Sequence, residues 1–99
     1  MKRMTETSAA VQNNAARSRF ELDTGEGLAF LSYHATPGLL VFYYTEVPRP
    51  LRERSIGSKL VHAAMEQVRA EGLKVVPRCG FVRHYIDTHP EFQDLVASR

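Results

Sequence analysis

The sequence predicts an α+β fold, in which a mixed β-sheet of about four strands packs against two main helices in the order β-β-β-α-β-α. Three strand-like segments separated by turn residues come first, and one long amphipathic helix follows them. A short apolar strand and a second helix complete the domain. Because a β-α-β crossover joins the third strand to the last, these two strands are expected to be parallel, whereas the first three form a meander.

Turn residues and apolar patterns define the three strands of the meander. Arg17–Thr24 is the first strand, and the turn Gly25–Gly27 has a length that suits a hairpin. Leu28–Ala35 is the second strand, and its residues alternate between two faces. Leu39–Val47 is rich in aliphatic, aromatic and β-branched residues, so we expect a central strand that is buried on both faces and ends at Pro48.

The segment Ile56–Glu71 has the clearest helical pattern. Its apolar residues recur every three or four positions, with Ser55 as the expected N-cap and Gly72 as the expected stop. Leu73–Val76 then reads as a short apolar strand, and Phe81–Thr88 as the second helix.

Length and charge limit the class of protein. A chain of 99 residues suffices for one domain. Residues 1–16 lack sustained periodicity and are expected to form a flexible tail, which leaves residues 17–99 as the single domain. The net charge of +2 is too weak to indicate a nucleic-acid partner.

Cysteine usage and hydropathy predict the location. Cys79 is the single cysteine, so no internal disulfide can form, which fits a reducing compartment. No apolar run approaches the roughly 18 residues of a membrane span, and no apolar segment follows Lys2 and Arg3 as a secretory signal requires. We expect a cytoplasmic protein without membrane contact, either a monomer or a weak homodimer formed through an open sheet edge.

A basic loop joins the third strand to the long helix. It carries Arg49, Arg52 and Arg54 against the acidic Glu53, and Lys59 follows in the helix. The N–H groups in the first turn of a helix have no intrahelical acceptors, and the helix dipole favours an anion there. A cationic loop that leads into a helix N-terminus therefore predicts a polyphosphate site, with a solvated charged loop as the alternative.

Three segments of the chain together resemble the GNAT superfamily of acyltransferases, in its short single-domain members. They are Thr45–Pro48 (TEVP), Arg52–Gly57 (RERSIG) and Val76–Glu91 (VPRCGFVRHYIDTHPE). The likeness covers about residues 18–96, nearly the whole chain. It implies a minimal GNAT-like fold, acetyl-CoA as the cofactor, and N-acetyltransferase activity towards an amine acceptor.

The resemblance also implies where the cofactor binds. GNAT proteins hold the CoA pyrophosphate in a loop of pattern Q/R-x-x-G-x-G/A at the start of the main helix, and the preceding strand splays from its neighbour to meet the pantetheine arm. In this chain the strand edge is Glu46–Val47. The implied cofactor-binding residues are Val47, Arg52, Glu53, Arg54, Ser55, Ile56, Gly57 and Ser58.

The sequence departs from the family pattern mainly in this loop. Ser55 stands at the first motif glycine, where its Cβ restricts the close approach that glycine permits. Glu53 puts a negative charge beside the expected phosphates, at a cost on the order of a kcal/mol. Elsewhere, Tyr44 replaces the usual histidine and Gly80 a frequent proline. These changes bear on cofactor affinity rather than on the fold.

Cys79 is the first candidate for chemistry. It lies between a predicted strand and a predicted helix, and the helix N-terminus together with Arg78 and Arg83 favours a thiolate. The resemblance implies a thiol beside the acetyl thioester, either as an acyl-carrying nucleophile or as a proton donor to CoA. The alternative is a small buried hydrophobe.

Tyr85 and Glu46 are the other two catalytic candidates. The resemblance implies that Tyr85 donates a proton to the CoA thiolate; as an alternative it packs in the core with Phe81, four residues earlier. Glu46 is a candidate general base for the amine, directly or through water, and alternatively a strand-end carboxylate paired with an arginine.

The histidines do not suggest a metal site. His84 and His89 follow Cys79 at successive spacings of five, which rotate by about 140° each on a helix and so diverge. His34 and His62 have no visible partner set and are expected to be ordinary surface or boundary residues. No metal is therefore predicted.

Two other functional classes compete with an acetyltransferase. The first is a non-catalytic CoA-binding or protein-interaction module with a degraded pyrophosphate loop. The changes at Glu53 and Ser55 favour it, as does the short length of chain that remains to build an acceptor pocket. The second is a basic nucleic-acid-binding domain, which the mild net charge disfavours.

Overall fold

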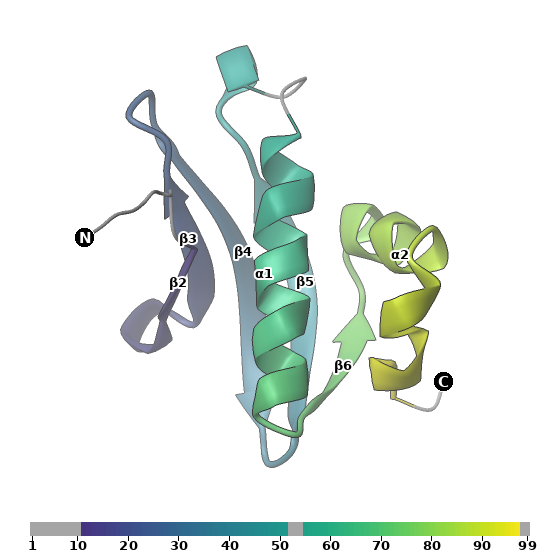
Figure 1. Ribbon diagram of the computed structural model, residues 1–99. Coiled ribbons are helices and arrows are strands. Elements are labelled where there is room, and N and C mark those ends of the chain that lie inside the picture. Colours follow the sequence, from purple (N-terminus) through teal and green to yellow (C-terminus); the bar gives the residue numbers. More distant parts are fainter. Residues whose placement is uncertain (1–10, 52–54, 98–99) are drawn as a thin grey trace, which may run out of the picture.

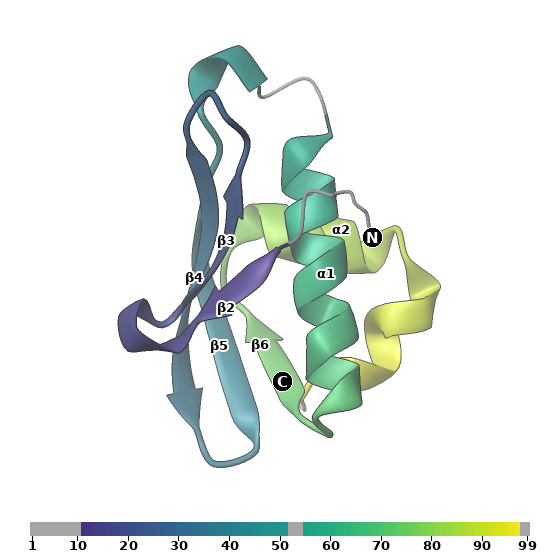
Figure 2. The same ribbon diagram turned by 60° about the vertical axis from the view of Figure 1, so that its left-hand side comes forward.

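The computed structural model describes residues 11–51 and 55–97, which form one five-stranded mixed sheet with helices on one face (Figure 1, Figure 2). The strand order is β2-β3-β4-β5-β6. The bounds are Gln12–Asn14 (β2), Arg19–Asp23 (β3), Leu28–Thr36 (β4), Leu39–Glu46 (β5), Ile56–Ala70 (α1), Lys74–Pro77 (β6) and Gly80–Asp87 (α2). Short 3₁₀ helices lie at Ala15–Arg17, Arg49–Leu51 and Pro90–Leu95. The predicted α+β class and mixed sheet are confirmed.

Residues 12–16, which the sequence analysis placed in the tail, form β2 and, together with Arg17 of the expected first strand, a 3₁₀ turn. β2 pairs antiparallel with β3, and Tyr33 Oη donates a hydrogen bond to Asn13 Oδ1 at 2.6 Å. The strand is polar and lies at the sheet edge, so no alternation of apolar residues marks it in the sequence. Residues 1–10 of the expected tail lie outside the described residues.

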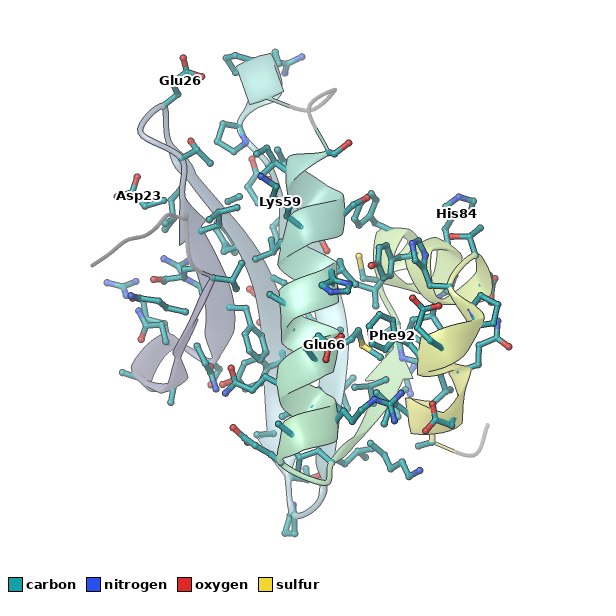
Figure 3. The ribbon with its side chains drawn as sticks, in the orientation of Figure 1. Asp23, Glu26, Lys59, Glu66, His84 and Phe92 are labelled. Carbon is teal, nitrogen blue, oxygen red and sulfur yellow. The ribbon has the colours of Figure 1, made fainter. Side chains whose placement is uncertain are left out.

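The crossover through α1 makes β5 and β6 parallel, as predicted, while the other neighbouring strands are antiparallel. α1 ends where the sequence indicates, because Gly72 adopts a φ of +69° and Leu73 N donates to Val68 O at 3.0 Å. The core lies between α1 and the sheet, and Phe92 fills the space between α1 and the C-terminal helices (Figure 3). The largest fully buried residues are Phe20, Phe42, Phe92, Leu22, Leu31, Leu60 and Met65.

β5 is central, between β4 and β6, but the prediction that both its faces are buried is wrong. Leu40 and Phe42 face the core, whereas Tyr43 and Tyr44 are 46% and 48% exposed. Figure 2 shows that α1, α2 and the C-terminal 3₁₀ helix lie on one side of the sheet and leave the other side of β5 open. Aromatic and β-branched residues favour strands on half-buried surfaces too, so composition does not separate the two cases.

Two carboxylates make the fold sensitive to acid. A hydrogen bond from the Arg19 guanidinium lowers the pKa of Glu21, and one from Arg69 lowers the pKa of Asp94. Both pKa values fall on folding, so the resulting stability is present above the unfolded values of about 4 and is lost as the pH falls through the folded values.

We therefore expect the thermal midpoint of the wild-type protein to drop as the pH falls below about 4, and that of Asp94→Asn to drop less steeply. Circular dichroism melts across this pH range measure both slopes. Equal acid slopes in the two proteins would contradict the contribution assigned to Asp94.

Candidate functional site

β5 is paired with β6 along only part of its length. The parallel ladder joins Leu39–Phe42 to Lys74–Pro77 and then stops, while β5 continues to Glu46. After β6 the chain turns into α2, and Figure 1 shows β6 and β5 diverging towards this end. The carboxyl ends of two diverging parallel strands are a common location for ligands in α/β sheets.

A β-bulge changes the direction of the side chains at the end of β5. Ser32 pairs with Tyr44 and Tyr33 pairs with Phe42, which leaves Tyr43 as the extra residue. Beyond the bulge, Thr45 pairs with the fully buried Leu31. Thr45 therefore takes the helix-covered face of the sheet.

Cys79 lies opposite Thr45 at the start of α2. Its N–H and that of Arg78 donate to Phe42 O at 3.0 and 2.9 Å, which fixes the turn from β6 into α2. Cys79 Sγ is 3.2 Å from Thr45 Oγ1. The thiol is half-buried at the N-cap position of α2. Partial exposure and a position at a helix N-terminus are features that reactive cysteines share, and Cys79 has both.

The first turn of α1 begins at Ser55. Lys59 N donates to Ser55 O at 3.0 Å, the first bond of the helix. The N–H groups of Ile56, Gly57 and Ser58 come before it and so have no acceptor within the helix. The loop residues Arg52, Glu53 and Arg54 lie outside the described residues.

Gly57 brings the starts of α1 and α2 together. A Cβ at this position would lie 2.7 Å from Phe81 Cζ, a distance that real side chains do not adopt. The Phe81 ring therefore lies directly on the backbone of α1, although it is 44% exposed. This contact places the first turn of α1 beside the helix that begins at Cys79.

Family comparison agrees with this arrangement. A family model described as GCN5-related N-acetyl-transferase matches residues 19–95, most of the chain. The chain belongs to this GNAT family. The NMR solution structure of a GCN5-like protein from Staphylococcus aureus matches it with a TM-score of 0.71 at 22% identity, covering 95% of this chain and 93% of that one. At this identity the likeness shows a shared fold, and no curated protein matches the chain.

Within this GNAT domain, Ser55 has an unusual backbone. It is the N-cap residue, as predicted, but its φ of 61° is left-handed and its side chain makes no capping hydrogen bond. The left-handed conformation costs an L-residue about 1–2 kcal/mol, and glycine avoids this cost. A glycine at this position, which the family resemblance implies, would avoid this backbone cost.

Ser55→Gly is expected to raise the free energy of unfolding by about 0.5–1 kcal/mol, because removal of the left-handed strain outweighs the added chain entropy. Ser58→Gly is the matched control. It makes the same substitution inside α1, where glycine is expected to destabilise by about 0.5 kcal/mol. Urea titrations measure the free energy of unfolding of both variants. A loss of stability in Ser55→Gly would contradict the backbone strain assigned to Ser55.

Tyr85 packs between α1 and α2, and its partner among the described residues is His62 rather than Cys79. Tyr85 Oη is 3.1 Å from His62 Nδ1, and the Tyr85 ring stacks on His89 at 3.8 Å. Burial raises the pKa of Tyr85, and the Glu91 and Glu66 carboxylates add to the shift. The phenol therefore keeps its proton at neutral pH.

Glu46 lies on the open face of the sheet. Tyr44 Oη donates to Glu46 Oε1 at 2.5 Å, and Phe30 is directly opposite Glu46 on β4. Because Thr45 takes the other face, Glu46 and Cys79 lie on opposite sides of β5. The three catalytic candidates are therefore not brought together: Cys79 contacts Thr45, Tyr85 contacts His62, and Glu46 contacts Tyr44.

His34 and His62 are exposed residues, as expected. The His62 side chain is 52% exposed, and its Nε2 lies 3.6 Å from Glu66 Oε2. His34 stacks on Tyr43 at 4.5 Å. His84 points away from α1 (Figure 3). In residues 11–51 and 55–97, no three His, Cys, Asp or Glu side chains gather as metal ligands, and no helix there is long and apolar enough for a membrane.

Sequence reasoning missed three residues of this region. Thr45 meets Cys79 only because of the bulge and the parallel register, which leave no local signal in the sequence. Phe81 was considered only as an alternative core partner of Tyr85, whereas it covers Gly57 and is 44% exposed. His62 could have been found from Glu66, since residues four apart are neighbours on a helix.

Proposed function

We propose that this GNAT domain binds acetyl-CoA and transfers its acetyl group to an amine. The observation that carries the proposal is the Cys79–Thr45 pair, which lies where β5 and β6 diverge. The Phe81–Gly57 contact holds the first turn of α1 close by. When bound, acetyl-CoA supplies an acetyl group on an activated thioester. A cytoplasmic location, where acetyl-CoA is available, is part of the same proposal.

The described residues fit such a cofactor. The N–H groups of Ile56, Gly57 and Ser58 form an anion site of the kind that helix N-termini provide. Gly57 has no side chain of its own, which lets the Phe81 ring pack on its backbone, and Val47 continues β5 towards the loop. Arg52, Glu53, Arg54 and Ser55 complete the proposed cofactor-binding set.

The chemistry is proposed for Cys79, Glu46 and Tyr85. Glu46 takes the proton of the incoming amine through water around the end of β5, because its carboxylate lies on the other side of that strand from Cys79. Cys79 either holds a transferable proton at Sγ or carries the acetyl group there, and Thr45 orients the sulfur. Tyr85 keeps its proton at neutral pH and is the second candidate, after Cys79, to donate a proton to the departing CoA thiolate. His62, which contacts Tyr85 Oη, connects it to solvent.

The experiment that tests this is the thermal midpoint with acetyl-CoA, CoA, ATP and phosphate. Ligand at about 100 times its dissociation constant adds about 2.7 kcal/mol, which means a shift on the order of 10 °C. We expect acetyl-CoA and CoA to give this shift and phosphate to give none. Thiol release above buffer in the presence of amines then establishes transfer.

The left-handed Ser55 favours one alternative, a non-catalytic module whose pyrophosphate loop has lost its function. It predicts no shift at millimolar acetyl-CoA, or a shift without thiol release for any amine. Either result would replace the acetyltransferase proposal.

A further inference from the structure

A groove of about 620 Å³ lies along the edge of the sheet at β6, next to the proposed acetyl site. Its floor is apolar and consists of Val76, Pro77, Val96 and Ala97. Arg78, Arg83 and Asp87 form its polar part. Arg78 lines the groove and is followed in the chain by Cys79, whose side chain contacts Thr45.

The C-terminal residues of the floor are held against β6. Ala97 N donates to Val75 O at 2.8 Å, and Val96 forms a parallel bridge with Val75. Pro77 lacks an N–H, so a peptide cannot extend the β6 ladder there through a backbone donor. Recognition at this edge therefore depends on side chains and on apolar contact with the floor.

The groove carries an excess of positive charge. Arg78 and Arg83 oppose the single carboxylate of Asp87, and all three residues are exposed. Arg83 Nη2 donates to Arg78 O at 3.2 Å, which holds the Arg83 guanidinium against β6. In the part of the chain that the structure describes, neither arginine forms an ion pair. Guanidinium groups bind carboxylates through paired hydrogen bonds, so this charge suits an acidic ligand.

We propose that the groove binds a short acidic peptide segment. Its volume lies in the range that holds a drug-sized ligand, which corresponds to several peptide residues rather than to one free amino acid. Apolar side chains of the segment contact the floor, and its carboxylates contact Arg78 and Arg83. We further propose that this peptide segment belongs to the amine acceptor, and this step alone rests on the proposed function.

The test measures binding directly, without any transfer. A fluorescein-labelled pentapeptide of alternating glutamate and alanine is titrated with the full-length protein, and fluorescence anisotropy gives the dissociation constant. Peptides with glutamine or lysine in place of glutamate are the ligand controls. We expect the glutamate peptide to bind about tenfold more tightly than the glutamine peptide and to weaken with added salt.

Arg83→Gln is expected to weaken binding of the glutamate peptide about fivefold and to leave the glutamine peptide unchanged. Arg17→Gln is the matched control, because it removes the same charge from an exposed site at the opposite edge of the sheet. Melting curves of both variants verify their folding. Equal weakening by the two variants, or equal binding of the glutamate and glutamine peptides, would overturn the proposal.

Failure of the two proposals can be told apart. If acetyl-CoA gives no thermal shift but the glutamate peptide binds with the expected preference, the groove stands and the acetyltransferase proposal falls. If acetyl-CoA binds and the glutamate peptide shows no preference over the lysine peptide, the groove proposal falls alone.

Discussion

Cys79→Ala is expected to lower kcat of the proposed acetyl transfer by about 10²–10³-fold, the range typical of a lost acid–base or nucleophilic group. The thiol is the proposed reactive group where β5 and β6 diverge, and Thr45 Oγ1 lies 3.2 Å from its sulfur. Binding of acetyl-CoA is expected to change less than about threefold, since the proposed anion site lies on α1. Steady-state kinetics and isothermal titration calorimetry measure the two quantities.

Thr45→Val separates positioning from chemistry in the same site. It keeps the shape of the side chain and removes the hydroxyl that contacts Cys79 Sγ. Loss of one hydrogen bond corresponds to about 1 kcal/mol, so we expect a decrease in kcat of about five- to tenfold with an altered pH profile. Full activity in Cys79→Ala would remove the cysteine from the mechanism and leave Tyr85 and Glu46 as the candidates.

The fold was largely predictable because its signals are local. The apolar pattern of α1, the stop at Gly72 and the turns between β3, β4 and β5 each depend on residues close in sequence. β2 was missed because a polar edge strand has no face to bury, and the open face of β5 was missed because its tyrosines suit either environment. Both errors concern which part of the protein packs against a strand. A single sequence carries no direct information about such long-range contacts.

The candidate site was predictable only in part, for the same reason. The position of Cys79 between a strand and a helix, and of Gly57 in a first helical turn, followed from local patterns. Their partners did not, since Thr45 and Phe81 lie more than twenty residues away along the chain. The structure also places Glu46 and Cys79 on opposite sides of β5. Alternation of side chains along the strand predicts the side of Glu46 correctly only if the position of the β-bulge is already known.

Gly27→Ala is expected to lower the free energy of unfolding by about 2–4 kcal/mol, which for a chain of this size lowers the thermal midpoint by at least about 10 °C. Two costs combine at this position. Gly27 has a φ of +136°, which is essentially restricted to glycine, and an added Cβ would lie 2.8 Å from Pro48 Cγ. The proline ring cannot rotate away as a long side chain does.

Gly25→Ala separates these two costs. Gly25 lies in the same turn with a φ of +82°, but a Cβ there meets nothing within 4 Å. It is expected to lose only about 1–2 kcal/mol, from backbone strain alone. The double variant Gly27→Ala/Pro48→Ala should recover the difference, as a double-mutant cycle requires. Because Pro48 begins the segment that leads to α1, Gly27→Ala is also expected to reduce the thermal shift caused by acetyl-CoA, whereas Gly25→Ala is not. Equal losses of unfolding free energy in Gly27→Ala and Gly25→Ala would show that Pro48 moves to make room for the added Cβ. In that case the hairpin does not position the start of the proposed cofactor loop.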